Sequence, residues 1–120
     1  MPEALATRTA RWVVVVELTA LPAWLALDHS TRESAVERAV HPVLASAPEV
    51  DVHWLDVESF TASCSDVLLA QTPDLLSWNR LWERMRDTPM FTVPYFRVER
   101  ILPGLVEGYR DVTRWTYPVG

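Results

Sequence analysis

The chain has 120 residues, a net charge of −5 and an apolar content of 49%, which is the size and composition of one globular domain. An acidic chain offers no basic surface to neutralise phosphates, so we expect no nucleic-acid partner. No apolar stretch approaches the roughly 20 residues that cross a bilayer, so we expect no membrane partner either. The one cysteine, Cys64, cannot form an internal disulfide, which predicts a reducing, cytoplasmic setting.

The scarcity of two residue types excludes several kinds of cofactor chemistry. All 11 basic residues are arginines, so the chain has no lysine for a Schiff base, a pyridoxal-phosphate anchor or a P-loop. The three glycines are too few and too dispersed for a loop that cradles a phosphate or dinucleotide. We therefore expect no cofactor. Arginine in place of lysine is also typical of a GC-rich bacterial genome.

The first half of the chain predicts a strand and then a helix. Four consecutive valines within Arg11–Leu18 predict a strand buried on both faces, followed by an apolar loop over residues 19–28. Ser30 and Glu33 read as a capping box that opens a helix, and Pro42 predicts a kink or a break in it near His41. The expected apolar face of this helix comprises Val36, Ala39, Val40, Val43 and Leu44.

The second half predicts two strands, a helix and a last strand. The strands are expected at Val50–Glu58 and Asp66–Gln71, joined by a short polar connection. Thr72 is the expected N-cap of the second helix. The last strand should run over Thr92–Leu102 and be broken by Pro103. The apolar stripe of the second helix comprises Leu75, Trp78, Leu81, Trp82 and Met85.

The element order β-α-β-β-α-β predicts an α+β, ferredoxin-like fold, in which a four-stranded antiparallel sheet carries two helices on one face. We expect a single domain over residues 1–120, with its core at about 11–112 and terminal extensions at 1–10 and 113–120. The helix-free face of the sheet is largely apolar, and a face of this kind is seldom left exposed to solvent. We therefore expect a homodimer whose two sheets close over one another as a dimeric α+β barrel.

Four segments together resemble the darcynin family, over about residues 11–112. They are PAWLAL (Pro22–Leu27), the acidic run Asp56/Glu58/Phe60, CSD (Cys64–Asp66) and TPMFTVPYF (Thr88–Phe96). The resemblance implies a dimeric α+β barrel, in agreement with the element order. It carries no catalytic residues, because barrels of this shape include cofactor-free monooxygenases, cyclases, isomerases, haem-degrading enzymes and proteins without known chemistry.

Candidate proton-transfer groups lie along the second strand. Asp56 and Glu58 alternate in line with Trp54, so they are either a general base and acid or the solvent-exposed end of the strand. His53 is the natural proton shuttle near neutral pH, or else a hydrogen-bonded structural histidine. Asp66 either joins these groups or caps the turn before it.

These groups do not share one face of a regular strand. His53 points away from Asp56 and Glu58, so only a bulge near Leu55 would bring all three to one wall. The histidines show no metal-binding spacing, so we expect no metal site.

Candidate substrate-binding groups lie on the apolar loop and the last strand. Trp24 is either a lid over a pocket or a plug at the end of the barrel. Tyr95, Arg97 and Glu99 alternate on one side of the last strand, opposite Arg100. Tyr95 and Arg97 would anchor a phenolate or carboxylate, or the polar ladder would serve only dimer contacts.

Two classes of function fit these observations, both of them homodimers, and the preferred one takes a small, largely apolar or aromatic molecule in its cavity. The first is a cofactor-independent cyclase, isomerase or monooxygenase of bacterial specialised metabolism, with His53, Asp56 and Glu58 catalytic and Trp24, Tyr95 and Arg97 substrate-binding. The second is a ligand- or partner-binding dimer without chemistry of its own. A third hypothesis, haem binding, has His53 or His41 as ligand.

Overall fold

A computed structural model describes residues 11–109, and the expected extensions at 1–10 and 113–120 lie outside the described residues. The strands are β1 (Trp12–Ala20), β2 (Asp51–Asp56), β3 (Asp66–Thr72) and β4 (Phe96–Leu105). The helices are α2 (Pro22–Leu25), α3 (His29–Ala35), η1 (Val36–Val40), α4 (His41–Ala45), α5 (Leu75–Arg86) and α6 (Pro89–Thr92).

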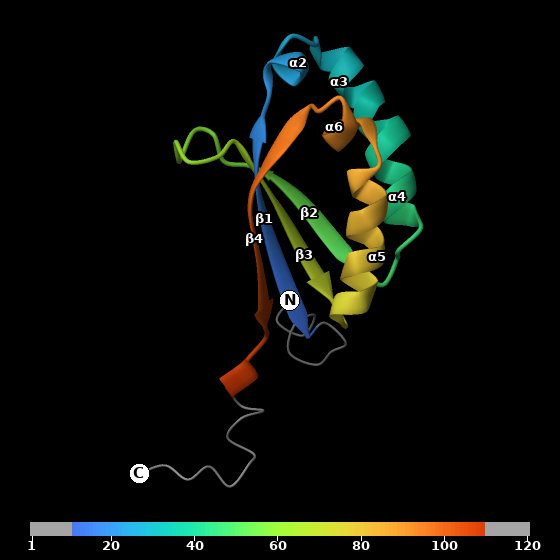
Figure 1. Ribbon diagram of the computed structural model, residues 1–120, viewed down its shortest axis with the longest axis vertical. Coiled ribbons are helices and arrows are strands. Elements are labelled where there is room, and N and C mark those ends of the chain that lie inside the picture. Colours follow the sequence, from blue (N-terminus) through green and yellow to red (C-terminus); the bar gives the residue numbers. More distant parts are fainter. Residues whose placement is uncertain (1–10, 110–120) are drawn as a thin grey trace, which may run out of the picture.

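The four strands form one antiparallel sheet in the order β2-β3-β1-β4. The helices lie on one face of this sheet, and its other face carries none of them (Figure 1). The ferredoxin-like α+β architecture expected from the element order is therefore confirmed.

Strand β1 is buried on one face only, so the expectation of a strand buried on both faces is wrong. Its side chains alternate between buried Val14 and Val16, which face the helices, and half-buried Val13 and Val15, which face away. The reason is the single helical layer: alternate side chains of a strand point to opposite faces, and only one face is covered.

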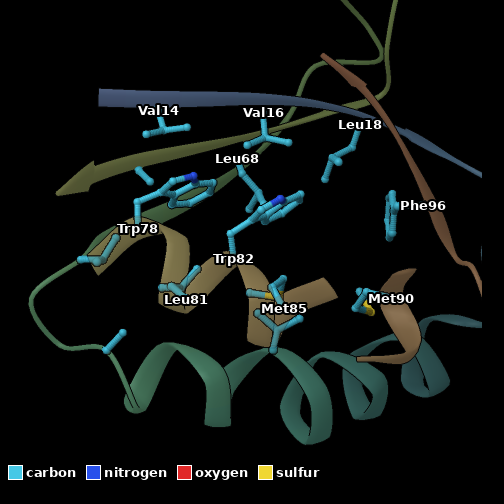
Figure 2. Packing of buried hydrophobic residues seen from close by; sticks show 14 residues of the cluster. Val14, Val16, Leu18, Leu68, Trp78, Leu81, Trp82, Met85, Met90 and Phe96 are labelled. Atoms are coloured by element: carbon cyan, nitrogen blue, oxygen red, sulfur yellow. The ribbon is translucent and has the colours of Figure 1, made fainter. Parts of the chain in front are cut away.

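The core lies between the sheet and helix α5. Trp78 and Trp82 stack with ring centroids 5.4 Å apart and an interplanar angle of 14°, and Leu81 and Met85 pack beside them (Figure 2). Four of the five residues expected in the helical stripe are thus buried. Leu75, the fifth, is the first residue of the helix and is exposed.

Both helix N-caps differ from the expected ones, because each helix begins at a different residue. Helix α3 starts at His29, and the Asp28 carboxylate accepts a hydrogen bond from the Thr31 N–H at 2.8 Å. Helix α5 starts at Leu75, and the Asp74 carboxylate accepts one from the Ser77 N–H at 2.7 Å. The side chain and the N–H of Thr31 lower the pKa of Asp28, and the N–H of Ser77 lowers the pKa of Asp74, so that both lie below the ordinary value of 3.8.

The segment α3-η1-α4 is one continuous helical run with a π turn in its middle. The His41 N–H bonds to the Val36 carbonyl, five residues back, immediately before Pro42. Proline has no N–H to contribute to an α-helical ladder, and the wider turn accommodates this loss without ending the helix. The expected kink at Pro42 is therefore a π turn.

Strand β4 continues through Pro103 to Leu105, so the expected break there is wrong. This strand lies at an edge of the sheet and pairs only with β1. A proline is tolerated on an edge strand because its missing N–H need not serve a second neighbour.

Candidate functional site

A cavity of about 310 Å³ lies between the helical layer and the sheet. From the sheet it is lined by Val52, Trp54, Asp66 and Phe96, and from the helices by Trp24, Val36, Val40, His41, Leu44 and Met90. Eight of these ten side chains are apolar or aromatic, and the other two are a carboxylate and an imidazole. This is the usual composition of a small-molecule site.

Aromatic rings from α2 and from the sheet form a continuous row at the cavity. The Trp24 ring lies 5.3 Å from Tyr95 and 5.1 Å from Phe96, between ring centroids, and Phe96 lies 5.3 Å from Trp54. Figure 2 shows Phe96 of β4 at the same end of the core as Met90 of α6. Tilted and edge-to-face pairs at these distances are favourable, so the row holds each ring in place.

Helix α3 fixes Trp24 from its other side. The Arg32 guanidinium carbon lies 5.7 Å from the centroid of the Trp24 ring, and Arg32 Nε donates to the Trp24 carbonyl oxygen at 3.2 Å. The indole is therefore held between a cation and the aromatic row. Trp24 lines the cavity as a packed wall.

Asp66 places a carboxylate in this largely apolar lining. Its Oδ2 accepts a hydrogen bond from the Trp54 indole N–H at 2.8 Å, and its Oδ1 accepts one from the Ser65 hydroxyl at 2.7 Å. Among residues 11–109, no arginine or histidine forms an ion pair with it. The carboxylate is thus oriented by two neutral donors and not by a cation.

The π turn positions His41 at the opposite wall. Val36, Val40, His41 and Leu44 all line the cavity, and the turn brings the adjacent residues Val40 and His41 to the same side. A π turn inside a helix is often found at functional sites.

A second hollow of about 490 Å³ lies over the helical layer and shares Val36 and His41 with the cavity. Its other lining residues are His29, Arg32, Glu33 and Glu37. It faces charged side chains on the surface of α3 and η1, which is typical of a solvated helix face, and Val36 is the one aliphatic side chain in its lining.

Asp56 and Glu58 occupy different environments. The strand register places Asp56 directly opposite Asp66, so it shares the face of Trp54 at the end of β2 and is exposed there. Glu58 lies beyond the strand, also exposed, and its backbone N–H bonds to the Asp56 Oδ1 at 3.2 Å. The structure therefore brings Asp56, but not Glu58, beside the carboxylate of Asp66.

His53 lies on the helix-free face of the sheet. Strand β2 pairs with β3 without a bulge, so His53 points away from Trp54, and its Nε2 lies 3.3 Å from the Asp51 Oδ2. The bulge near Leu55 that would have joined His53 to the carboxylates does not occur. Its proposed proton-transfer role stays a prediction, on a surface remote from the cavity.

Arg97 also lies on the helix-free face, in a polar network with Glu99 and Thr19. Arg97 donates to the Glu99 Oε2 at 2.8 Å, and the Thr19 hydroxyl donates to the same oxygen at 2.6 Å. These bonds lower the pKa of Glu99, the Thr19 bond most of all and the Arg97 bond next.

A bulge in β4 overturns the expected alternation. Leu18 pairs with Val98 but Glu17 pairs with Arg100, so Glu99 is an extra residue. Arg100 therefore shares the helix-free face and bonds to Glu17 at 2.8 Å, a bond that raises the pKa of Arg100. Tyr95 precedes the strand and packs on Trp24.

The predicted site residues are thus divided between two faces of the sheet. Trp24 and Tyr95 lie on the helix side, whereas His53 and Arg97 lie on the other. From the sequence, His41 was considered only as a haem ligand, and Asp66 only as an addition to the carboxylates of the second strand. The sequence signal that could have indicated His41 was the neighbouring Pro42.

Three absences concern the part of the chain that the structure describes. Within residues 11–109 no group of three or more His, Cys, Asp or Glu side chains could hold a metal ion. Over the same range no helix is long and apolar enough to cross a membrane. Cys64 is buried and forms no disulfide there.

The fold and this cavity define a class: small α+β proteins with a ferredoxin-like sheet and a pocket beneath the helices. Residues 5–117 match the family model described as "Darcynin, domain of unknown function", a wider range than the expected 11–112. The chain belongs to the darcynin family. It is 40% identical over 70 residues to darcynin of Chromobacterium violaceum, covering 58% of this chain and 89% of that one. It is 33% identical over 89 residues to a darcynin homologue of Streptomyces avermitilis, covering 73% of each.

The solved structures that resemble the chain include chlorite dismutases. Chlorite dismutase from Candidatus Nitrospira defluvii in complex with imidazole matches with a TM-score of 0.71 and 10% identity, over 87% of this chain and 42% of that one. A mutant of the same enzyme matches with a TM-score of 0.69 and 11% identity, over 100% and 54%. The chain spans about half the length of these proteins, and at this identity the likeness shows the fold alone.

Proposed function

We propose that the protein binds a small, largely apolar or aromatic molecule in the cavity between the helical layer and the sheet. The observation that carries this proposal is the lining: an aromatic row on one wall, aliphatic side chains on the other, and two polar groups, Asp66 and His41. A volume of about 310 Å³ is at the lower end of the range for ligand sites, which suits a compact molecule.

A cavity-filling substitution tests this proposal. Val36 is half-buried on η1 and lines the cavity, so Val36→Phe should occupy the space of the ligand. Leu76→Phe adds the same ring at an exposed position of α5 and is the matched control. Native mass spectrometry of gently purified protein should show a reproducible small-molecule mass on the wild type and on Leu76→Phe, but not on Val36→Phe. A mass that persists in Val36→Phe, or a wild type without one, contradicts the proposal.

The proposal includes assembly as a homodimer through the helix-free face of the sheet. Six apolar side chains lie on this face: Val13, Val15, Leu55, Val67, Leu69 and Leu102. The charged side chains of the same face are paired within the chain, Glu17 with Arg100, Glu99 with Arg97, and Asp51 with His53. A second copy can therefore cover this face without bringing unpaired like charges together.

The dimer is tested at the middle of this face. Leu69 lies on β3 between Val15 and His53 of the neighbouring strands, so Leu69→Glu should place a carboxylate in the interface. Leu76→Glu, exposed on α5, is the control. Analytical ultracentrifugation should give a dimer for the wild type and for Leu76→Glu, and a monomer for Leu69→Glu. A monomeric wild type contradicts the proposed assembly.

The second candidate function is enzymatic: a cofactor-independent cyclase, isomerase or monooxygenase. It is favoured by one observation, that a carboxylate and an imidazole line the same apolar cavity, where either can move a proton. Once a bound molecule is known, its turnover should fall in Asp66→Asn and in His41→Ala, and remain unchanged in His53→Ala. Loss of turnover in His53→Ala alone would instead support the site expected from the sequence.

Haem binding is tested independently of these proposals. Of its two expected ligands, His41 lines the cavity, whereas His53 lies on the other face of the sheet. The expectation of no cofactor stays a prediction, and a Soret band in the purified protein would contradict it.

A further inference from the structure

We infer that the cavity selects an organic cation, such as a protonated primary amine on an aromatic or aliphatic skeleton, and that the Asp66 carboxylate is its anchor. This inference rests on the proposed function, because it specifies the chemistry of the ligand in the same cavity. It goes beyond that function by giving the ligand a charge.

The Asp66 carboxylate has spare hydrogen-bonding capacity. An ionised carboxylate has about four acceptor sites. Two are used, by the Trp54 indole and the Ser65 hydroxyl, and no cation among residues 11–109 takes the others. A carboxylate beside apolar surface is stabilised most by a donor that also carries positive charge.

The groups that hold this carboxylate are themselves fixed in place. The Ser65 hydroxyl oxygen also accepts the Ala20 N–H at 2.7 Å, so the group that holds Oδ1 is itself fixed to β1. The Trp54 ring that holds Oδ2 is packed edge-on against Phe96. A pre-oriented acceptor binds a cation without the entropic cost of ordering a free side chain.

Aromatic rings line the cavity beside the carboxylate. Trp24, Trp54 and Phe96 line the same cavity, and indole faces attract cations. Trp24 already shows this preference, because the Arg32 guanidinium lies over its ring from outside the cavity. Aromatic rings with a carboxylate recognise ammonium groups, whereas an anionic ligand would meet the carboxylate and the ring faces as repulsive surfaces.

The neighbouring strand β2 places a second carboxylate close to Asp66. Asp56 lies directly opposite Asp66 on the same face of the sheet. Like charges in such a cross-strand pair repel each other, so a ligand cation at Asp66 relieves part of this repulsion. The other titratable side chain that lines the cavity is His41, on the opposite wall.

The test compares four probes of nearly equal size: 2-phenylethylamine, 2-phenylethanol, propylbenzene and 3-phenylpropionate. Titration calorimetry with the full-length wild type should give the tightest binding for the amine, weaker binding for the two neutral probes and none for the acid. Asp66→Asn should weaken amine binding by about ten- to a hundredfold, which is the effect of losing a hydrogen bond to a charged group. The same variant should leave propylbenzene binding unchanged.

The matched control is Asp51→Asn, which removes a carboxylate from the other face of β2 and should leave all four affinities unchanged. Wild-type binding of propylbenzene or 3-phenylpropionate as tight as that of the amine overturns the inference and leaves the proposed function standing. If 2-phenylethanol binds most tightly, the cavity prefers a neutral hydrogen-bond donor to a cation, and the inference is also overturned. A wild type that binds none of the probes contradicts the inference and the proposed function together.

Discussion

The indole N–H of Trp54 on β2 donates a hydrogen bond of 2.8 Å to the carboxylate of Asp66 on the neighbouring strand β3. The two side chains are diagonal neighbours on the face that meets the helices, since Trp54 is paired with Leu68 and Asp66 with Asp56. One bond therefore ties together two residues of the cavity wall and holds the orientation of the carboxylate.

Trp54→Phe should lower the free energy of unfolding by about 1–3 kcal/mol, because a half-buried carboxylate loses its indole donor while a smaller aromatic ring remains. Urea denaturation followed by circular dichroism measures the change. Trp12→Phe is the control, because Trp12 is equally half-buried on β1 but its indole makes no hydrogen bond within residues 11–109. Equal losses in the two variants would show that the Trp54–Asp66 bond contributes nothing.

Met90→Ala should lower the free energy of unfolding by about 2–5 kcal/mol, the range for truncating a fully buried methionine. The same change enlarges the cavity, so a bulkier probe should gain affinity relative to a small one. Urea denaturation and titration calorimetry check the two effects. Leu76→Ala, at an exposed position, should change neither, and a similar loss of stability there would refute the assignment of Met90 to the core.

Thr19→Val should raise the pKa of Glu99 toward its ordinary value of 4.5, because the largest cause of its lowering is the hydrogen bond from the Thr19 hydroxyl. The bond between Arg97 and Glu99 remains, so the rise should be incomplete. An NMR titration of the Glu99 carboxyl carbon measures it. An unchanged pKa would mean that the Thr19 bond is absent in solution.

Asp74→Ala should lower the melting temperature at neutral pH, because helix α5 loses its N-cap. The folded-state pKa of Asp74 lies below the ordinary 3.8, so its contribution to stability is present above that value and is lost as the pH falls through the folded-state pKa. The variant should therefore show a smaller difference in melting temperature between neutral and acidic pH. Asp87→Ala, at the other end of the helix, should leave this difference in melting temperature unchanged. If the two variants change it equally, Asp74 does not act as the N-cap of α5.

The order of strands and helices follows from the sequence because hydrophobic periodicity and turn residues are local signals. The stripe of α5 from Trp78 to Met85 is one such signal, and its burial follows directly. The π turn before Pro42 and the bulge at Glu99 are different, because each depends on how a whole element packs against its neighbours. The first brings His41 to the cavity wall, and the second turns Arg100 to the helix-free face.

The location of the candidate site was the least predictable feature. Alternation along β2 indicated that His53 and Trp54 point apart, but it left open which face of the sheet lines the cavity. Which of them faces the cavity depends on the layer that the helices cover. The bond between Trp54 and Asp66 further requires the register of two strands, which no local pattern of residues specifies.

The central claim, that the binding site lies beneath the helices, is tested most directly by following backbone and indole N–H resonances in a ¹⁵N NMR titration with propylbenzene and 2-phenylethylamine. The account predicts saturable shifts of the Trp24 and Trp54 indole resonances in the wild type, and their loss in Val36→Phe. Shifts confined to the helix-free face, around His53 and Arg97, or no saturable shift with either probe, would contradict it.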